Sequence, residues 1–391
     1  MTLAPTPPAN AFAASEADAL DQEKFPLRVS LCAACGHLQL IDVVDPVALF
    51  SDYVYVSGTS PSFVAHFDGY ANSVCERLDV STGDLVVDVG SNDGTLLRSF
   101  ASRGCRVLGI DPATKIAESA NAAGIETIND FFTETLAEEI RESHGAAKVV
   151  TANNVFAHVD DLAGIARGIR RLLSDEGIFV FEVSYLVDVF QQTFFDTIYH
   201  EHLDYHRVGP LRRFFRRLGM TLHHVERIST HGGSLRGYAA VGEREVSDSV
   251  RALEKLEDDL GLSKPQTYRV FEKNIRRRGE ELLSLCEGLT ARSFRIYGYG
   301  APAKATTLMH HFGLGRDVVS AVIDDSPWKQ GLYTPGLGIS VSAADRIVAD
   351  KPDYLLVLAW NFAGPIIEKS ADFTAAGGRF IVPLPRLSIR P

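Results

Sequence analysis

Apolar and polar positions in the middle of the chain alternate between two periods. Short apolar runs rich in β-branched residues are separated by longer segments in which apolar positions recur every three or four residues. The runs are typical of buried parallel strands and the longer segments of amphipathic helices. We expect strands at 85–89, 107–110, 125–128, 147–152 and 178–183, and helices at 62–78, 95–100, 113–123, 134–142 and 161–173. The order predicts an α/β, Rossmann-like parallel sheet with both faces covered.

The pattern after residue 183 predicts a second unit of the same kind. An insertion at 185–209 precedes a helix and a terminal hairpin, and a charged helical segment follows at 243–287. Its basic patch at 276–278 is best interpreted as a solvated helix face. A strand, a glycine turn and a helix then begin at 294–305, with further strands at 318–324, 354–359 and 380–383. The C-terminal third is therefore predicted to be a smaller Rossmann-like domain.

The first 60 residues lack this regularity. Residues 1–24 are rich in Ala and Pro without a convincing period, which predicts a poorly ordered or extended leader. Residues 25–40 place Cys32 and Cys35 in a tight turn between two strand-like runs, a spacing typical of a zinc-ribbon knuckle.

Composition narrows the class of protein. The 391 residues are 46% hydrophobic and 23% charged, which indicates two or three globular domains. A formal net charge of −11 argues against a nucleic-acid partner. No signal peptide or membrane-spanning run is evident, and five cysteines do not form a secreted disulfide framework. We expect a cytoplasmic protein without a membrane partner, and the oligomeric state stays open.

The stretch 85–100 carries the clearest candidate site. Gly90 and Gly94 allow a sharp turn between strand and helix, and Asn92 lies inside that turn. Asp88, just before the turn, would repel a pyrophosphate but suits a cationic amine and neutral hydroxyls. The stretch resembles motif I of the class I S-adenosylmethionine (SAM) methyltransferases. Asp111 ends the next strand, where an acid can hold both ribose hydroxyls.

Two further loops at strand ends carry polar groups where ligands of such sheets bind. Asn129, Asp130 and Phe131 combine an amide, an acid and an aromatic ring, which suits the edge and face of an adenine. Asn153 follows the next strand, and His158 comes a turn later. We include the first four of these residues in the predicted cofactor site.

The insertion contains more reactive side chains than a connecting loop needs. Residues 197–206 include three histidines, two acids and two tyrosines. The chain contains, in order, the Cys knuckle, the SAM motif, this insertion and the later segments GYGAPAKATT and IDDSPWKQGLYTPG. This ordered set resembles the sugar C-methyltransferases of deoxysugar biosynthesis. Those enzymes methylate C3 of a nucleotide-linked 4-keto-hexose. The resemblance runs from about residue 25 to the C-terminus.

The resemblance implies catalytic roles for Tyr199, Glu201 and His202, with Tyr53 and His158 as supporting groups. Histidine is the natural base for removing a proton beside a ketone, so His202 is expected to act as the base. Glu201 would steer or polarise it, and Tyr199 would donate to the enolate or keto oxygen.

The second glycine turn is expected to hold the sugar nucleotide through Gly298, Gly300 and Lys304, because a lysine at a helix start favours an anionic diphosphate. The resemblance also implies an N-terminal module with zinc on four cysteines, of which this chain supplies Cys32 and Cys35. The module therefore looks truncated at the front. The pair is a remnant, or a preceding segment is missing, or His37 and an outside ligand contribute.

These expectations divide the chain into three parts. A leader and a partial zinc-ribbon-like module occupy 1–60, and a SAM-dependent methyltransferase domain occupies 61–243. A helical connector and a C-terminal Rossmann-like, sugar-nucleotide-binding domain occupy 244–391.

Three alternatives remain at this point. His200, His202 and His206 are candidates for a metal site, although no H-E-x-x-H motif is present. The same SAM core would also serve O- or N-methylation of a sugar nucleotide. A non-catalytic scaffold that binds SAM or a nucleotide is the third interpretation.

Overall fold

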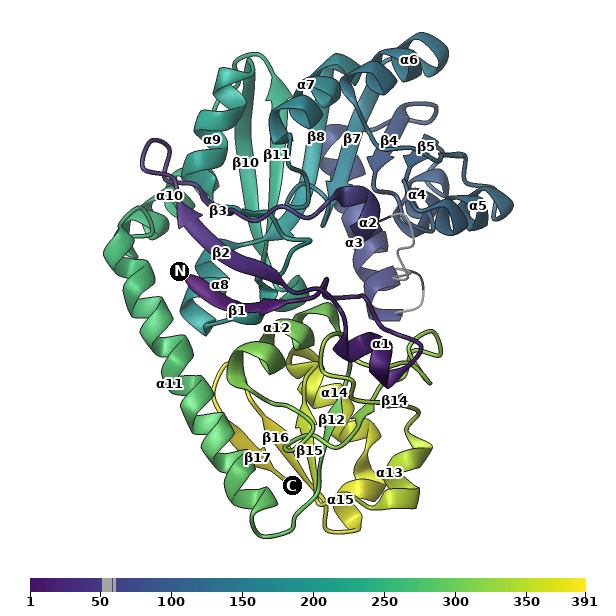
Figure 1. The fold of residues 1–391 in the computed structure, drawn as a ribbon. Coiled ribbons are helices and arrows are strands. Elements are labelled where there is room, and N and C mark those ends of the chain that lie inside the picture. The colour runs from purple at the N-terminus through teal and green to yellow at the C-terminus, as the bar shows by residue number, and fades with distance from the viewer. Residues whose placement is uncertain (51–57, 59–60) are drawn as a thin grey trace.

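The computed structural model describes residues 1–50, 58 and 61–391. It consists of two α/β domains, with the N-terminal segment lying between them (Figure 1). Tyr53, one of the predicted supporting residues, lies outside the described residues.

The upper domain in Figure 1 contains a seven-stranded sheet in the order β10-β11-β8-β7-β4-β5-β6. The parallel strands are β4 (Leu85–Val89), β5 (Arg106–Ile110), β6 (Thr127–Ile128), β7 (Ala147–Asn153) and β8 (Leu173–Ser184). The antiparallel hairpin of β10 (Met220–Ile228) and β11 (Ser234–Val241) completes the sheet beside β8. The predicted strand order along the chain and the terminal hairpin are therefore confirmed.

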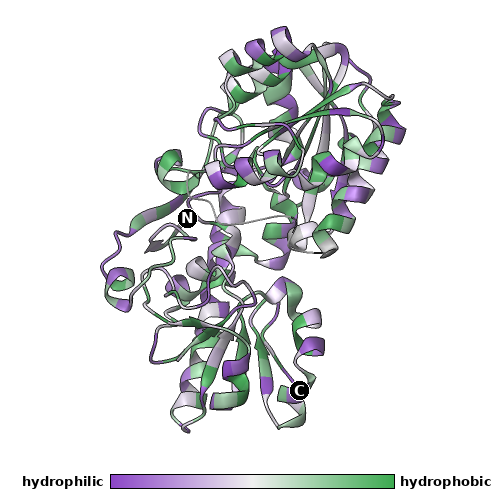
Figure 2. Ribbon diagram, turned by 90° about the vertical axis from the view of Figure 1, so that its right-hand side faces the viewer, coloured by the Kyte–Doolittle hydropathy of each residue, from purple (hydrophilic) through white to green (hydrophobic). Residues whose placement is uncertain are grey.

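Helices cover both faces of this sheet because its strands are apolar on both sides. Val86 packs into a cluster with α3 (Pro61–Leu78) and α4 (Thr95–Ala101). Val87 packs on the opposite face with α6 (Glu134–His144), α7 (Leu162–Leu172) and α9 (Val208–Arg217). The pleat directs successive side chains to opposite faces, so a continuous valine run fills two cores. In Figure 2 the helices around the sheet of the upper domain carry both hydrophobic and hydrophilic stretches, as helices with one buried face do.

The lower domain repeats the strand–turn–helix plan in a six-stranded sheet of order β14-β13-β12-β15-β16-β17. Its strands are β12 (Ile296–Tyr299), β13 (Val322–Ile323), β14 (Val341–Ser342), β15 (Tyr354–Val357), β16 (Arg379–Val382) and β17 (Ser388–Arg390). Its helices include α12 (Ala303–Phe312), α13 (Asp345–Asp350), α14 (Ala363–Lys369) and α15 (Ala371–Ala375). Helices α10 (Asp248–Asp259) and α11 (Pro265–Thr290) connect the two domains.

The N-terminal segment is ordered, and of the two alternatives predicted for residues 1–24, a poorly ordered or an extended leader, the extended one agrees with its first strand. β1 (Thr2–Thr6), β2 (Phe25–Leu31), β3 (Leu38–Leu40) and β9 (Asp204–Tyr205) form one antiparallel sheet, and α1 (Glu16–Leu20) follows β1. Leu3 and Ala13 are buried, and Ala13 exchanges two backbone hydrogen bonds with Tyr333 of the lower domain. Contacts far along the chain give this segment an order that its local period does not show.

The insertion between β8 and α9 packs with this N-terminal sheet and with the lower domain. It contains α8 (Leu186–Gln192), a 3₁₀ turn at Phe195–Thr197 and β9. One apolar cluster joins residues of β2, of the insertion and of α12, among them Leu27, Phe195 and Leu308. The insertion is therefore held from both sides.

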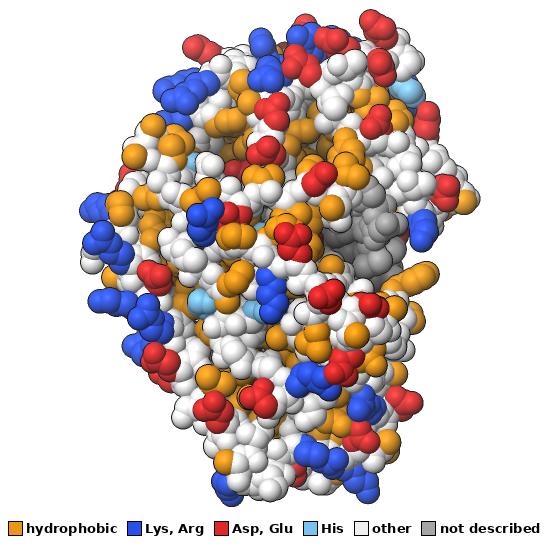
Figure 3. Space-filling model, in the orientation of Figure 1, with side chains coloured by type: hydrophobic (Ala, Val, Ile, Leu, Met, Phe, Trp, Pro, Cys, Tyr) orange, Lys and Arg blue, Asp and Glu red, His pale blue; other side chains and the backbone are white. Residues whose placement is uncertain are grey.

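Charged side chains are mixed over much of the face in Figure 3, with Lys and Arg gathered along its left edge over α11. Within the described ranges, no helix is both long and apolar enough to cross a membrane.

Candidate active site and cofactor loop

The turn after β4 has the shape that its glycines predict. Gly90 and Gly94 have φ values of +69° and +74°, a region that favours glycine. A Cβ on Gly90 would lie 2.3 Å from Cγ2 of Val155, and one on Gly94 would lie 2.9 Å from Cγ2 of Ile125. Any side chain at these positions would displace the neighbouring loops, so both glycines are required for the close approach.

Asp88 lies beneath this turn and is buried. Its Oδ1 accepts a hydrogen bond of 2.6 Å from the Thr151 hydroxyl on β7. Burial raises the pKa of Asp88 to about 7, although the Thr151 hydrogen bond opposes the rise. The acid is therefore poised to change its charge near neutral pH.

Asp111, at the end of β5, ties the turn to the next loop. Its two carboxylate oxygens accept from the backbone N–H groups of Asn92 at 2.8 Å and Ala113 at 2.9 Å. Burial raises the pKa of Asp111, and these two hydrogen bonds oppose the rise. Each carboxylate oxygen keeps a further lone pair, so a ligand's two hydroxyl groups can still donate to it.

The other predicted cofactor residues lie along the same edge of the sheet. The Asn129 amide donates to the backbone oxygen of Asp111 at 3.0 Å, and the Asp130 carboxylate accepts from the Phe131 N–H at 2.7 Å. The Asn153 side chain has buried amide atoms with no hydrogen-bond partner in the described part of the chain. Buried polar atoms without partners are costly unless a ligand or water satisfies them. With the glycine cradle, they fit a bound SAM.

The predicted base lies in the insertion and has a defined tautomer. Nδ1 of His202 is 2.7 Å from the Thr197 carbonyl oxygen, which only accepts, so this nitrogen carries the proton. In the neutral ring Nε2 then holds a lone pair, and it lies 2.9 Å from the Tyr199 hydroxyl. The two rings are 4.0 Å apart between centroids. Tyr199 and His202 therefore form one hydrogen-bonded pair.

His158 stacks on this pair from the loop after β7. Its ring centroid is 4.9 Å from that of His202, and Phe50 stacks on it at 5.8 Å. Burial, together with His202, holds the pKa of His158 well below its usual range, so His158 is neutral at pH 7. Its buried Nε2 has no hydrogen-bond partner among the described residues. A substrate oxygen or hydroxyl is a suitable partner for that nitrogen.

Glu201 contacts the N-terminal segment. Its buried carboxylate accepts a hydrogen bond of 2.9 Å from the Asn10 amide. Nδ1 of His202, the next residue, contacts the backbone carbonyl of Thr197. The prediction that Glu201 steers or polarises His202 stays a prediction.

The neighbouring histidines have structural roles. Nε2 of His200 lies 3.0 Å from the Pro26 carbonyl, and Nε2 of His206 lies 2.9 Å from the Phe156 carbonyl. Across residues 1–50, 58 and 61–391, no group of three or more His, Cys, Asp or Glu side chains is arranged to hold a metal ion. The contacts of the described residues therefore do not support a metal site built from His200, His202 and His206.

The cysteine knuckle likewise does not make a zinc site from the residues that the structure describes. Cys32 and Cys35 are free thiols in the turn between β2 and β3. His37, the nearby candidate ligand, instead lies 2.6 Å from the Asp204 carboxylate. Since a structural zinc ion needs four ligands, the residues described do not fit it.

The second glycine turn is closely packed. A Cβ on Gly298 would lie 2.7 Å from Cδ1 of Leu358, and Gly300 has a φ of +87°. The Lys304 ammonium donates to the Asn361 side chain at 2.6 Å and lies 3.5 Å from the ring centroid of Trp360. Burial lowers the pKa of Lys304 to about 8, and Asp196 of the insertion opposes this. The lysine therefore links the lower domain to the insertion.

Several of these contacts were absent from the sequence predictions. They involve the Thr151 hydroxyl, the Thr197 carbonyl, the Asn10 amide and the Asp196 carboxylate, which accepts from the Trp360 indole at 2.6 Å. Thr197 begins the segment whose reactive side chains the sequence singles out, Asp196 directly precedes it, and Trp360 lies in an aromatic segment.

The sheet order and the acidic glycine turn define a class I SAM-dependent methyltransferase. Three family descriptions match the chain: "Putative zinc binding domain" over residues 1–50, "Methyltransferase domain" over 75–225, and "C-methyltransferase C-terminal domain" over 229–385. The three matched ranges correspond to the N-terminal segment, the upper domain and the lower domain described above.

Among curated relatives, the chain is 37% identical to the C-methyltransferase NovU of Streptomyces niveus over 382 residues, 97% of this chain and 91% of that protein. A ubiquinone biosynthesis O-methyltransferase of Burkholderia pseudomallei (strain 1710b) is 29% identical over 161 residues, 38% of this chain and 69% of that protein. The structure of magnesium protoporphyrin IX methyltransferase from Synechocystis PCC 6803 with bound SAM matches 46% of this chain and 81% of that one, with 17% identity and a TM-score of 0.35.

The match to NovU extends over nearly all of both chains. The chain therefore belongs to the C-methyltransferase family that its motifs indicated, and it is a SAM-dependent methyltransferase.

Proposed function

We propose that this enzyme transfers the methyl group of SAM to C3 of a nucleotide-linked 4-keto-hexose. A carbon atom becomes a nucleophile only when a proton leaves it, and a neighbouring ketone lowers that cost by forming an enolate. Methylation at carbon therefore needs a base as well as a methyl donor. SAM supplies the electrophilic methyl carbon when it is bound.

The arrangement of His202 supports this proposal best. The Thr197 carbonyl fixes the proton on Nδ1, so Nε2 is the nitrogen that can accept a proton from C3. The electron pair of the broken C–H bond moves into the C3–C4 bond, and the C4 oxygen becomes negative. The Tyr199 hydroxyl, 2.9 Å from Nε2, can then turn from the imidazole toward that oxygen and donate to it.

The loop contacts support a short path between cofactor and base. Gly90 of the cofactor turn approaches Val155, and the His158 N–H donates to the Val155 carbonyl at 2.8 Å. His158 in turn stacks on His202. The cofactor turn and the base are therefore joined through one loop, which suits transfer between a bound methyl donor and the substrate carbon.

The lower domain is the proposed support for the sugar nucleotide. Its glycine turn, with Gly298 and Gly300, begins a helix whose N–H groups suit a diphosphate. Lys304 would contribute positive charge there while it keeps its contact with Asn361. Tyr53 keeps its predicted supporting role, and a cytoplasmic location remains our expectation.

The experiment is exchange of the C3 hydrogen in deuterated water, with a 4-keto sugar nucleotide and without SAM. We expect exchange with the wild-type enzyme and a loss of about 10²- to 10⁴-fold with His202→Ala, the usual range for a positioned base. The affinity for S-adenosylhomocysteine should remain, and His144→Ala, on the distant helix α6, serves as the matched control. Methylation without exchange by the wild type would favour O- or N-methylation, and near-normal exchange by His202→Ala would place the base elsewhere.

A further inference from the structure

Residues 7–13 of the N-terminal segment are bound along the lower domain. The Thr306 hydroxyl of α12 donates to the Ala9 carbonyl at 3.0 Å. Four residues later, Ala13 and Tyr333 exchange backbone hydrogen bonds of 3.1 and 2.9 Å. The segment is thus fixed at two points, and Asn10 lies between them.

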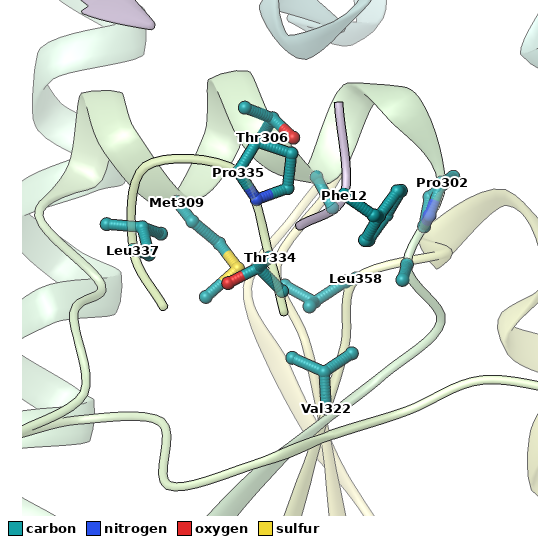
Figure 4. Close-up of a pocket in the computed structure, with 11 residues that line it drawn as sticks. Phe12, Pro302, Thr306, Met309, Val322, Thr334, Pro335, Leu337 and Leu358 are labelled. Carbon is teal, nitrogen blue, oxygen red and sulfur yellow. The ribbon is translucent and has the colours of Figure 1, made fainter. Parts of the chain in front are cut away.

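Phe12 provides a third anchor. Its side chain extends from the N-terminal segment toward Pro302 and Leu358, in a crevice beside the second glycine turn (Figure 4). The side chains around this crevice leave only about 10 Å³ of open space, roughly the room of one water molecule. The Lys329 ammonium lies 5.3 Å from the Phe12 ring centroid. The aromatic ring therefore holds the segment down close to Asn10.

Asn10 projects from this fixed segment to the catalytic loop. Its amide nitrogen donates to Oε1 of Glu201 at 2.9 Å, and Glu201 is only 2% exposed. The same helix that holds Ala9 also holds the loop, because the Thr307 hydroxyl donates to the Ile198 carbonyl at 2.8 Å. Both partners of the Asn10–Glu201 hydrogen bond are therefore fixed by neighbouring residues of α12.

A hydrogen bond to a buried carboxylate stabilises its charged form and fixes its direction. Lys329 also lies within electrostatic reach of Glu201. Glu201 directly precedes His202 in the chain, and a charged carboxylate held there would stabilise the imidazolium that forms when His202 accepts a proton. That advantage arises as the reaction proceeds, so it raises the rate more than it raises substrate affinity.

We propose that Asn10 is a positioning residue, which holds the Glu201 carboxylate in place for the reaction at His202. This inference rests on the proposed function and extends the active site to a segment that the motifs do not reach. Phe12 and Thr306 serve it by fixing the backbone on either side.

The test is a double-mutant cycle of Asn10→Ala and Glu201→Gln in the full-length enzyme, read in methyl-transfer turnover and in C3 exchange. We expect Asn10→Ala to lower kcat about 10- to 100-fold with little change in KM, the range of one hydrogen bond to a charged group. In the Glu201→Gln background, Asn10→Ala should lower kcat by less than about twofold, because the side chain at position 201 is then already neutral. Asn10→Asp, which opposes two carboxylates, should be slower than Asn10→Ala.

Glu16→Ala is the matched control. It removes an exposed ion pair with Arg316 that also ties the N-terminal segment to the lower domain, but it does not touch Glu201. We expect it to keep wild-type kcat. Equal losses from Asn10→Ala in both backgrounds, or full activity of Asn10→Ala, would overturn the proposal. If the wild type transfers methyl groups without C3 exchange, the base assignment fails, while the cycle in turnover still decides the role of Asn10.

Discussion

The buried carboxyl of Asp88 gives a quantitative test of the cofactor loop in Asp88→Asn. The variant keeps the size of the side chain and an oxygen that accepts from Thr151, but it cannot ionise. In the wild type, burial raises the pKa of Asp88 from 3.8 to about 7. A folded-state pKa above the unfolded value means that the folded protein holds the proton more tightly. Its contribution to stability is complete below about pH 4 and is lost as the pH rises through 7.

The magnitude follows from the two pKa values. A rise from 3.8 to about 7 corresponds to about 4 kcal/mol in the free energy of unfolding, and about 3 kcal/mol of this falls between pH 5 and pH 8. Without SAM, wild-type and variant proteins should therefore be similarly stable below about pH 4, and at pH 5 the variant should already be more stable by about 1–2 kcal/mol. By pH 8 the variant should be more stable than the wild type by about 4 kcal/mol, about 3 kcal/mol more than at pH 5.

The assay is urea denaturation of the apo protein at several pH values, followed by circular dichroism. The difference between variant and wild type is the quantity to compare, because Glu257 and Asp196 are also buried acids with raised pKa values. Thr151→Val is the matched variant with the opposite expected effect. It removes the hydroxyl that stabilises the ionised form of Asp88, so the stability lost with rising pH should be larger than in the wild type. Parallel curves for wild type and Asp88→Asn would refute the reasoning.

Two further predictions concern the contacts around the site. Asp111→Asn replaces one accepting oxygen by a donor that faces a backbone N–H, so S-adenosylhomocysteine should bind about 10- to 100-fold more weakly by calorimetry. Glu139→Gln, at an exposed position of α6, should bind as the wild type does, and equal affinities for both variants would contradict the role of Asp111. Trp360→Phe removes the indole N–H that donates to buried Asp196, so the free energy of unfolding should fall by about 1–3 kcal/mol. Trp328→Phe, at a side chain that is 68% exposed, should leave the free energy of unfolding unchanged. Equal stabilities of the two variants would show that the indole hydrogen bond does not stabilise the fold.

The sequence predicted the methyltransferase sheet closely because its elements have strong local periods. The strand expected at 107–110 is β5 (Arg106–Ile110), and the helix expected at 134–142 is α6 (Glu134–His144). The glycine positions were also predictable, since a tight turn between strand and helix restricts the residues it accepts. Local pattern and tertiary structure agree in this domain.

The prediction for the N-terminal segment left a poorly ordered and an extended leader open, because its order depends on residues about 300 positions away. Pro and Ala give no period, yet Thr306 and Tyr333 fix the backbone of this segment. The proton position on His202 had no signal in the sequence either. It is set by the Thr197 carbonyl, and every residue has a carbonyl, so only the folded loop shows which one is used.

The loop that carries the proposed base contacts the cofactor domain, the N-terminal sheet and the lower domain. Ile198 and Leu203 flank the Tyr199–His202 pair and belong to the apolar cluster of the N-terminal sheet and the lower domain. The loop rests on the cofactor domain through the Ala157 carbonyl, which accepts from the Leu203 N–H at 2.8 Å. The loop thus packs against the N-terminal sheet and the lower domain, and it is hydrogen-bonded to the cofactor domain. In the proposed function, this support keeps the base at a fixed distance from the cofactor turn, while residues of the N-terminal segment and the lower domain face the proposed substrate. We therefore infer that these parts of the chain serve the chemistry as well as substrate recognition.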